Sequence, residues 1–243
     1  MKTINVSLVG VGGQGILLTA NMLARTATIA GMDVKKSEIH GMAQRGGSVI
    51  SSVRFGTEVF SPIIPEGQSD VLVAFDRLEA LRWKHFLAKD GKVLMNNVDL
   101  VPVTVSSGLQ QPVTDFETRL AKAFPDALVV DAPKIAEEVG NARTMNMVIA
   151  GALSALTPFK ESQWVKAMEE SFTGPKAKLL SIGRKRLPAN WVTMFRAVRL
   201  AVLPIRRAMA SPRALSPSGD CRHASISGET ASSIRASHVA SST

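Results

Sequence analysis

Near its amino terminus the chain reads Ile4-Asn-Val-Ser-Leu-Val-Gly10-Val-Gly-Gly-Gln-Gly15, a mainly apolar run that ends in four closely spaced glycines. Apolar residues then recur at every third or fourth position as far as Gly31. The first run predicts a buried strand, and the recurring apolar residues predict one face of an amphipathic helix that stops at Gly31. The glycines between the two elements predict a tight turn. This strand, turn and helix unit indicates an α/β domain.

Further apolar runs alternate with helical patterns along the chain. The patterns predict strands near residues 34–39, 48–55, 70–75, 92–95 and 127–130, with residues 101–105 extending or flanking the fourth, and helices near residues 78–87, 114–124, from 133, 145–156 and 161–172. Strands that alternate with helices predict a mostly parallel sheet with helices on both faces, a Rossmann-like three-layer sandwich. Its middle strands leave room for an antiparallel pair.

Several polar residues predict where individual elements begin or turn. Asp76 directly precedes the helix near residues 78–87 and has the short acceptor side chain that caps helix amino termini. Thr114 and Glu117 have the spacing of a capping box. Asp90-Gly91 predicts a turn between a helix and a strand. These residues therefore set the expected boundaries around the middle of the sheet.

The net charge divides the chain into two parts. The whole chain has a formal net charge of +9, and residues 184–243 carry ten Lys and Arg against two Asp and Glu. The nearly neutral remainder does not fit a nucleic-acid groove, so no nucleic acid is expected as a partner. We therefore predict a main domain over residues 1–183 and a basic, partly disordered tail over residues 184–243.

The basic tail itself has two regions. Apolar residues with four arginines predict a candidate amphipathic helix at residues 190–209, kinked at Pro204. Residues 211–243 are rich in Ser, Ala and Arg and poor in large apolar side chains, so we expect them to be disordered. The tail is either an extension without a role, a linker, or an anchor for an acidic partner or a membrane surface.

The composition excludes several kinds of site. One cysteine in 243 residues cannot build a disulfide framework or ligate an iron–sulfur cluster alone, and it fits a reducing cytoplasm. His40 and His85 show no metal-ligand spacing, and no nucleophile and base pair stands out. Neither a transmembrane segment nor a signal peptide is expected from the apolar runs. We therefore predict a cytoplasmic protein without a metal site or a catalytic group of its own.

The glycine turn is the leading candidate for cofactor binding, and its residues are Gly10, Gly12, Gly13, Gln14 and Gly15. Glycines before a helix let backbone N–H groups approach a phosphate at the helix amino terminus. A dinucleotide site also requires an acidic residue about 20 positions later, at the end of the next strand, and Glu38 follows Gly15 at a similar distance. The alternative is that the glycines only make a tight turn and allow the helix to pack closely on the strand.

The densest polar stretch is Ser37-Glu-Ile-His-Gly-Met-Ala-Gln-Arg-Gly-Gly-Ser48. Arg45 followed by Gly46 and Gly47 suits an anion, because a guanidinium offers paired donors and the glycines expose backbone N–H groups. His40 can donate a proton to a bound group, and Glu38 can hold Arg45 in place instead of touching a ligand. The alternative is a polar surface loop whose arginine and histidine are only solvated.

Taken in order, these motifs resemble the gamma-type domain of the 2-oxoacid:ferredoxin oxidoreductase family over residues 3–183. The resemblance is carried by Gly10–Gly15, Ser37–Ser48, Ser61-Pro-Ile-Ile-Pro65-x-Gly67, Glu79-Ala-Leu-Arg82, Asn141-x-Arg143-x-x-Asn146-Met147 and Gly151–Leu156. The segment His40-Gly-Met-Ala-Gln-Arg-Gly-Gly47 is highly specific. Within the family the pattern is most similar to small subunits of arylpyruvate enzymes, with indolepyruvate as the expected substrate.

The resemblance implies an oxidative decarboxylation carried out by a larger complex. An arylpyruvate, coenzyme A and oxidised ferredoxin give an arylacetyl-CoA, carbon dioxide and reduced ferredoxin. Thiamine diphosphate and 4Fe–4S clusters belong to a large alpha subunit, so this chain is expected to hold no cofactor alone and to complete the active site in trans. Its two glycine loops are expected to lie together at the carboxyl edge of the sheet, facing the partner's thiamine diphosphate and the incoming coenzyme A.

Two other functions fit parts of the sequence. The glycine turn is compatible with a stand-alone NAD(P)-dependent oxidoreductase, although the chain has no Tyr to act as a catalytic acid. It is also compatible with a nucleotide-binding module that carries a basic tail. Binding of a nicotinamide cofactor by the isolated chain would favour the first of these. A neighbouring reading frame with a thiamine motif and cysteine clusters would favour the family role.

Overall fold

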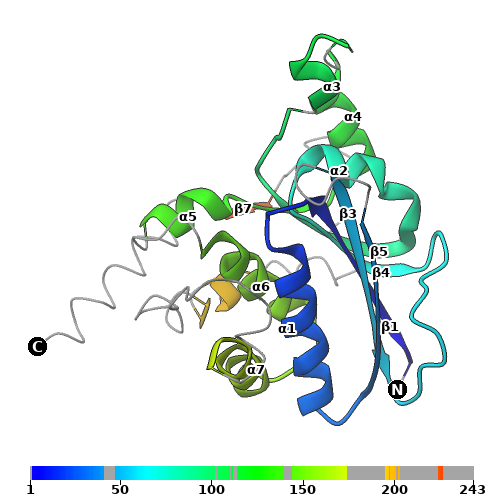
Figure 1. Ribbon diagram of the computed structural model, residues 1–243, viewed down its shortest axis with the longest axis vertical. Coiled ribbons are helices and arrows are strands. Elements are labelled where there is room, and N and C mark those ends of the chain that lie inside the picture. The colour runs from blue at the N-terminus through cyan, green and yellow to red at the C-terminus, as the bar shows by residue number, and fades with distance from the viewer. Residues whose placement is uncertain are drawn as a thin grey trace, which may run out of the picture.

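The computed structural model describes residues 2–40, 47–101, 103–109, 111, 114–138, 144–173, 195–196, 198–200, 202 and 224–226. Within these ranges the strands form a seven-stranded sheet in the order β2-β3-β1-β4-β5-β6-β7 (Figure 1). The strands are β1 (Ile4–Val11), β2 (Asp33–His40), β3 (Ser48–Gly56), β4 (Ser69–Ala74), β5 (Leu87–Asn96), β6 (Leu128–Val130) and β7 (Ala224–Ile226). The first strand of the chain therefore lies in the interior of the sheet.

The sheet is mostly parallel. β1, β4, β5, β6 and β7 pair in parallel, whereas β3 runs antiparallel to both of its neighbours, β1 and β2. Val49 of β3 lies opposite Gly10 of β1 and opposite His40 of β2. The ends of β1 and β2 and the start of β3 are therefore at one edge of the sheet. The prediction of a mostly parallel sheet with an antiparallel pair is confirmed.

Helices cover both faces of the sheet, as the three-layer prediction requires (Figure 1). The first face carries α1 (Ile16–Ile29), α5 (Ala132–Glu138), α6 (Met145–Leu156) and α7 (Glu161–Thr173), and the second carries α2 (Arg77–Arg82) and α4 (Phe116–Ala123). Neighbouring side chains of a strand point to opposite faces, so Leu8 joins the core under α1 whereas Val9 joins the core under α2. Every residue of α6 from Met147 to Leu156 is buried, as its uniformly apolar sequence predicts.

The glycine at the end of α1 acts as the predicted helix stop. Gly31 has a φ of +79°. Its N–H donates to the carbonyl of Thr28, and the Met32 N–H donates to the carbonyl of Ala27, each over 3.0 Å. These two bonds form a Schellman motif, which satisfies carbonyls at a helix end and favours glycine at the left-handed position.

The prediction that residues 101–105 extend or flank a strand is wrong. Val103–Ser106 form a short helix, α3. The chain turns away from the sheet directly after β5, because the Val98 N–H donates to the Asn96 carbonyl (2.9 Å) and the Leu100 N–H donates to Asp76 Oδ2 (2.7 Å). These two bonds hold the chain in a turn toward the start of α2, so the residues that follow do not continue β5.

The region between α2 and β5 also differs from the predicted pattern. α2 ends at Arg82, a short 3-10 helix, η1 (Lys84–Phe86), follows it, and β5 already begins at Leu87. The expected turn at Asp90-Gly91 lies inside β5, where the register against β4 shifts. A Cβ atom at Gly91 would lie 2.7 Å from the Ser69 carbonyl oxygen. Glycine therefore lets this irregular part of the strand approach β4.

The predicted cap of α2 is confirmed, whereas the predicted capping box of α4 is wrong. Asp76 occupies the N-cap position of α2 and accepts bonds from its first turn. At α4 the N-cap position is held by Asp115 and not by Thr114, and it makes no side-chain cap bond. The Asp115 carboxylate instead accepts from Arg119 Nε over 2.8 Å. An ion pair across one helical turn therefore replaces the box expected from Thr114 and Glu117.

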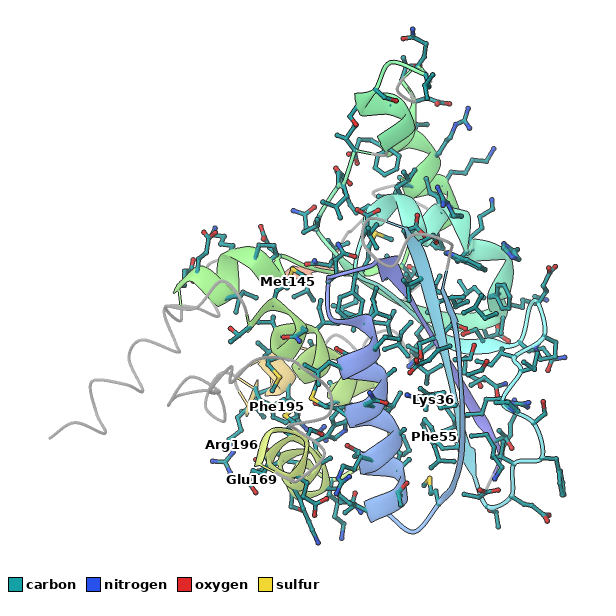
Figure 2. All side chains as sticks on the ribbon, viewed as in Figure 1. Lys36, Phe55, Met145, Glu169, Phe195 and Arg196 are labelled. Carbon is teal, nitrogen blue, oxygen red and sulfur yellow. The ribbon has the colours of Figure 1, made fainter. Side chains whose placement is uncertain are left out.

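Part of the predicted tail packs on the domain. Within residues 190–209 the structure describes residues 195–196, 198–200 and 202, and these are helical. Phe195, Val198 and Val202 are fully buried in the same core as α6 and α7. Phe195 lies beside both helices (Figure 2). A Cβ atom at Gly151 of α6 would come within 3.3 Å of Val198 Cβ. The glycine therefore permits this close approach.

Two of the four arginines in the predicted amphipathic helix contact the domain. Arg196 Nε lies 2.5 Å from Glu161 Oε1, and Arg199 donates to the carbonyls of Ser154 (2.7 Å) and Phe159 (3.0 Å). Arg206 and Arg207 lie outside the described residues. The expectation of disorder over residues 211–243 is wrong at Ala224–Ile226, because β7 pairs with β6 and gives its outer edge a partner.

Replacing Gly31 by alanine should lower the free energy of unfolding by about 1 kcal/mol, because a Cβ atom is strained at a left-handed φ. Gly31→Asn should lose roughly half as much, because asparagine tolerates this conformation better. Equilibrium urea unfolding followed by circular dichroism measures both variants. A larger loss for asparagine than for alanine would contradict the proposed backbone cause.

Candidate functional site

Two loops meet where the parallel strands end. β1 leads into Gly12, and β3 begins at Ser48 directly after Gly47. The Gly12 N–H donates to the Gly47 carbonyl oxygen over 2.9 Å. Ligands of parallel α/β sheets bind at this edge, beyond the carboxyl ends of the strands. The glycine turn and the end of the second loop are therefore joined at the edge where the fold places a ligand.

The Gln14 side chain holds the glycine turn together by two hydrogen bonds to backbone groups. Its Oε1 accepts from the Val11 N–H (2.8 Å), and its Nε2 donates to the Phe75 carbonyl (3.1 Å). Gly10 provides the necessary room, because a Cβ atom there would lie 2.6 Å from Gln14 Oε1 and 2.8 Å from Phe75 Cβ. Gly10 and Gln14, both predicted to bind a cofactor, are therefore packed parts of the turn.

Asn96 extends this network to the neighbouring strand and helix. Its buried side chain donates from Nδ2 to the Phe75 carbonyl (3.2 Å) and accepts at Oδ1 from the Ala132 N–H (3.1 Å). Met145, at the start of α6, lies beside this end of the sheet (Figure 2), with its Sδ 3.3 Å from Asn96 Nδ2. The sequence predicts for Asn96 only a turn at the end of a strand, and not this part in the candidate site. An amide directly after the apolar run of β5 is the signal that points to it.

The remaining glycines of the turn have different surroundings. Gly15 has a φ of +89°, and a Cβ atom there would lie 2.8 Å from Asn146 Nδ2 at the start of α6. Gly13 has a φ of +109°, is exposed, and would place a Cβ atom more than 4 Å from the surrounding atoms. Among the described residues, Gly13 is therefore open on its Cβ side, next to the N–H groups of the first turn of α1, which lack partners within the helix.

The second loop is described at its two ends. His40 is the last residue of β2, and Gly47 is half-buried. Arg45 and Gly46 lie outside the described residues. The register of β2 with β3 brings the backbone of His40 to the same edge as the glycine turn.

Glu38 does not occupy the position that a dinucleotide site requires. In such a site the acidic residue ends the strand beside the one that leads into the glycine turn, but here β3 separates β2 from β1. Glu38 lies opposite Ser51, which lies opposite Leu8, so it is two strands away from β1 and level with a residue before the turn. Its carboxylate pairs with Lys36 Nζ. The position of Glu38 therefore does not support the dinucleotide interpretation of the glycine motif.

A buried carboxylate on α2 contacts the end of the second loop. Glu79 is 3% exposed, and its Oε2 accepts from the Ser48 hydroxyl and from Trp83 Nε1, the latter over 3.1 Å. Arg82 Nε lies 3.4 Å from Oε1. Sequence reasoning identified Glu79 and Arg82 only as part of a motif, because the partner Ser48 is 31 positions away.

Asp76 holds three backbone groups at the same edge. Its carboxylate, 1% exposed, accepts from the N–H groups of Leu78 (2.9 Å), Glu79 (3.1 Å) and Leu100 (2.7 Å). Burial raises the pKa of the Asp76 carboxyl above its ordinary value, and the three hydrogen bonds oppose that shift. Asp76 therefore fixes both the start of α2 and the path of the chain after β5.

A pocket of about 220 Å³ lies between α4 and the ends of β5 and β6. Its lining residues are mostly apolar and are Arg77, Met95, Asn97, Glu117, Leu120, Ala121, Phe124, Ala127 and Val129. The Arg77 guanidinium pairs with Asp99 and with Glu117. Because this cation is already compensated, the pocket suits an apolar group better than an anion.

The motif at Ser61–Gly67 lies away from this edge. Arg54 donates to the carbonyls of Ser61 (2.9 Å) and Ile63 (2.7 Å), and to Asn5 Oδ1 (2.9 Å). Arg54 and Asn5 are paired near the start of β1. The loop is therefore held at the opposite end of the strands from the Gly12–Gly47 contact.

The described part of the chain contains no group of three His, Cys, Asp or Glu side chains placed to hold a metal ion. None of its helices is both long enough and apolar enough to cross a membrane.

The sequence profile of a family described as Pyruvate ferredoxin/flavodoxin oxidoreductase matches residues 5–187. "Indolepyruvate oxidoreductase subunit IorB" of Thermococcus kodakarensis is 43% identical over 166 residues, which are 67% of this chain and 82% of that relative. This relative is similar to the present chain over most of its own length.

Solved structures share the fold. The gamma subunit of a keto/oxoacid ferredoxin oxidoreductase from Geobacter sulfurreducens matches with a TM-score of 0.53 and 20% identity, over 84% of this chain and 99% of that one. The 2-oxoglutarate:ferredoxin oxidoreductase from Magnetococcus marinus, with 2-oxoglutarate, coenzyme A and succinyl-CoA bound, matches with a TM-score of 0.58 and 18% identity. That match covers 89% of this chain and 33% of the other. In that protein the fold is one part of a longer chain.

Gly10→Ala should lower the free energy of unfolding by about 3 kcal/mol, because the added methyl group overlaps Phe75 Cβ and displaces Gln14. Gly13→Ala is the matched control, and it should lose only about 1 kcal/mol, from backbone strain without a clash. Urea unfolding curves of both variants test the difference. Equal losses of unfolding free energy would show that the close packing around Gly10 does not require a glycine there.

Asp76→Asn should destabilise the protein more at pH 4 than at pH 7. With a raised pKa in the folded state, the native protein binds the Asp76 proton more readily than the unfolded chain does. This titration therefore adds stability at low pH that is lost as the pH rises through the folded pKa, and asparagine cannot provide it. Unfolding free energies of both proteins at the two pH values are the measurement, with exposed Asp90→Asn as the control substitution. A smaller destabilisation at pH 4 would contradict the assignment.

Proposed function

The chain belongs to the pyruvate ferredoxin/flavodoxin oxidoreductase family, and we propose that it is the small subunit of an indolepyruvate ferredoxin oxidoreductase. The observation that carries the proposal is the 43% identity to the Thermococcus kodakarensis subunit over 82% of that subunit. A match over most of a relative's length supports a shared role of the whole subunit, beyond a shared fold.

In the proposed reaction one arylpyruvate, one coenzyme A and two oxidised ferredoxins give one arylacetyl-CoA, one carbon dioxide, two reduced ferredoxins and one proton. The bond between the carboxyl and keto carbons breaks, a thioester bond forms, and two electrons leave one at a time. When bound, thiamine diphosphate supplies the nucleophilic carbon and the electron sink, and 4Fe–4S clusters carry the electrons. We place both groups in a large alpha subunit, since the one cysteine of this chain cannot ligate a cluster alone.

The role of this chain in that complex is to complete the active site in trans. The glycine turn and the Arg45–Gly47 loop offer backbone N–H groups, the amino terminus of α1 and a guanidinium, all of which suit phosphate groups. Coenzyme A and thiamine diphosphate both carry phosphates. The Gly12–Gly47 hydrogen bond supports a single surface made from both loops. Within it we assign ligand contact to Gly12, Gly13, His40, Arg45 and Gly46, and support of the turn to Gly10, Gln14 and Gly15.

The proposed partners and location follow from the same reaction. The large subunit and, through the complex, ferredoxin are the protein partners, and the 2-oxoacid is the small-molecule substrate. We place the complex in the cytoplasm, because a single cysteine fits a reducing compartment. For residues 184–243 we propose no ligand, since Arg196 and Arg199 contact the domain.

The proposal is tested by producing this chain anaerobically together with the thiamine-type subunit of the neighbouring reading frame. Reduction of a viologen dye is measured with indolepyruvate, phenylpyruvate and pyruvate, with and without coenzyme A. We expect coenzyme A-dependent reduction with the two aryl substrates and little with pyruvate. A complex that fails to form, or turnover of a keto acid by this chain alone, would overturn the proposal.

Arg45→Ala should raise the KM for coenzyme A by about tenfold or more in the assembled enzyme, because a charged hydrogen bond to a phosphate is worth about 1.5–3 kcal/mol. The fold should remain intact, which a thermal unfolding curve checks. Arg25→Ala is the matched control, since Arg25 lies on α1 and pairs with Glu170. An unchanged KM for coenzyme A in the Arg45 variant would show that Arg45 does not contact coenzyme A.

A further inference from the structure

Glu79 has contacts that neither helix formation nor the proposed chemistry requires. Its carboxylate is buried, although α2 is a short helix in which Glu79 and Ala80 are the buried residues. One oxygen, Oε2, accepts from both the Ser48 hydroxyl and the Trp83 indole N–H. Trp83 Nε1 also lies 3.1 Å from Ser48 Oγ. The three side chains therefore form a closed set around a single acceptor.

Ser48 connects this set to the candidate site. It is the first residue of β3. Gly47, directly before it, has no side chain that could fix the position of the Gly47 backbone. The Gly47 carbonyl is the group that receives the Gly12 N–H. A shift of Ser48 therefore moves the carbonyl that joins the second loop to the glycine turn.

A buried acceptor oxygen is suited to hold such a junction. Removing the acceptor would leave the half-buried Trp83 N–H with the Ser48 hydroxyl as its remaining acceptor, and would remove the hydrogen bond that the Ser48 hydroxyl donates. The neighbouring Arg82 approaches the other oxygen at 3.4 Å. Oε1 is therefore not needed for the contact with Ser48.

We propose that Glu79 is a positioning residue, which acts through Ser48 to hold the Gly47 carbonyl against Gly12 and so sets the surface that receives the phosphates of coenzyme A. The inference rests on the proposed function for the identity of the ligand. The acceptor oxygen, and not the negative charge, carries the role, because a glutamine can present its carbonyl oxygen at the place of Oε2 and its amide away from Ser48.

The first test uses the assembled enzyme. Glu79→Ala and Ser48→Ala should each raise the KM for coenzyme A about fivefold or more, with kcat changed less than about twofold, and the double variant should show no further rise because both remove the same link. Glu79→Gln should keep a KM near that of the wild type. Glu66→Gln, at an exposed glutamate of the Ser61–Gly67 loop, is the matched control.

The second test uses the full chain without its partner. Trypsin cleavage after Arg45 reports how firmly the second loop is held. Glu79→Ala and Ser48→Ala should be cleaved several-fold faster than the wild type, and Glu79→Gln should be cleaved at nearly the wild-type rate. This measurement does not depend on activity, and Ser48→Ala keeps it decisive should Glu79→Ala fail to fold.

The outcomes separate the two proposals. A Ser48→Ala variant with wild-type KM and wild-type cleavage would overturn the positioning role, as would a Glu79→Gln variant that behaves like Glu79→Ala. An assembled wild-type enzyme that does not use coenzyme A would overturn the proposed function. In that case the cleavage rates would still show whether Glu79 holds the loop.

Discussion

One carbonyl oxygen, that of Phe75 after β4, holds the candidate site at the edge of the sheet together. It accepts hydrogen bonds from Gln14 of the glycine turn and from Asn96 at the end of β5. The other atoms of both amides are also bonded, to Val11 and to Ala132. Buried amide groups are costly to leave unpaired. The turn is therefore fixed to two neighbouring strands and to α5 before any ligand arrives.

The direction of β3 explains why two loops far apart in sequence share this edge. In an all-parallel sheet the start of a strand lies at the amino edge, away from ligands. β3 is antiparallel to β1, so its start at Ser48 lies where β1 ends. The second loop is thereby brought against Gly12, and α2 can reach it through Glu79. The same arrangement places β3 between β1 and β2, which removes Glu38 from the position of a dinucleotide-binding acid.

Local patterns predict most of the elements, whereas pairing between distant residues is not visible in them. The strand, turn and helix at Ile4–Ile29, the cap at Asp76 and the buried helix α6 follow from periodicity and from short-range chemistry. The glycine turn was also identified, because glycine spacing is a local signal. The sheet order, the amide network of Asn96 and the contact of Glu79 with Ser48 join residues more than 30 positions apart in several cases. Other differences between the predicted and observed elements come from short-range hydrogen bonds that the sequence pattern does not reveal. Examples are the Arg119 bond to Asp115, in place of the capping box, and the Val98 bond to the Asn96 carbonyl, which turns the chain after β5.

The segment around Phe195 lies beyond residue 187, where the family profile ends, yet it is part of the interior. Arg199 brings a cation to the carbonyl end of α6, where the helix dipole is negative. Gly151 leaves the space that Val198 fills. Residues that the family profile does not include thus pack against α6, which the profile does include. The shared fold and this added segment therefore have one continuous hydrophobic core.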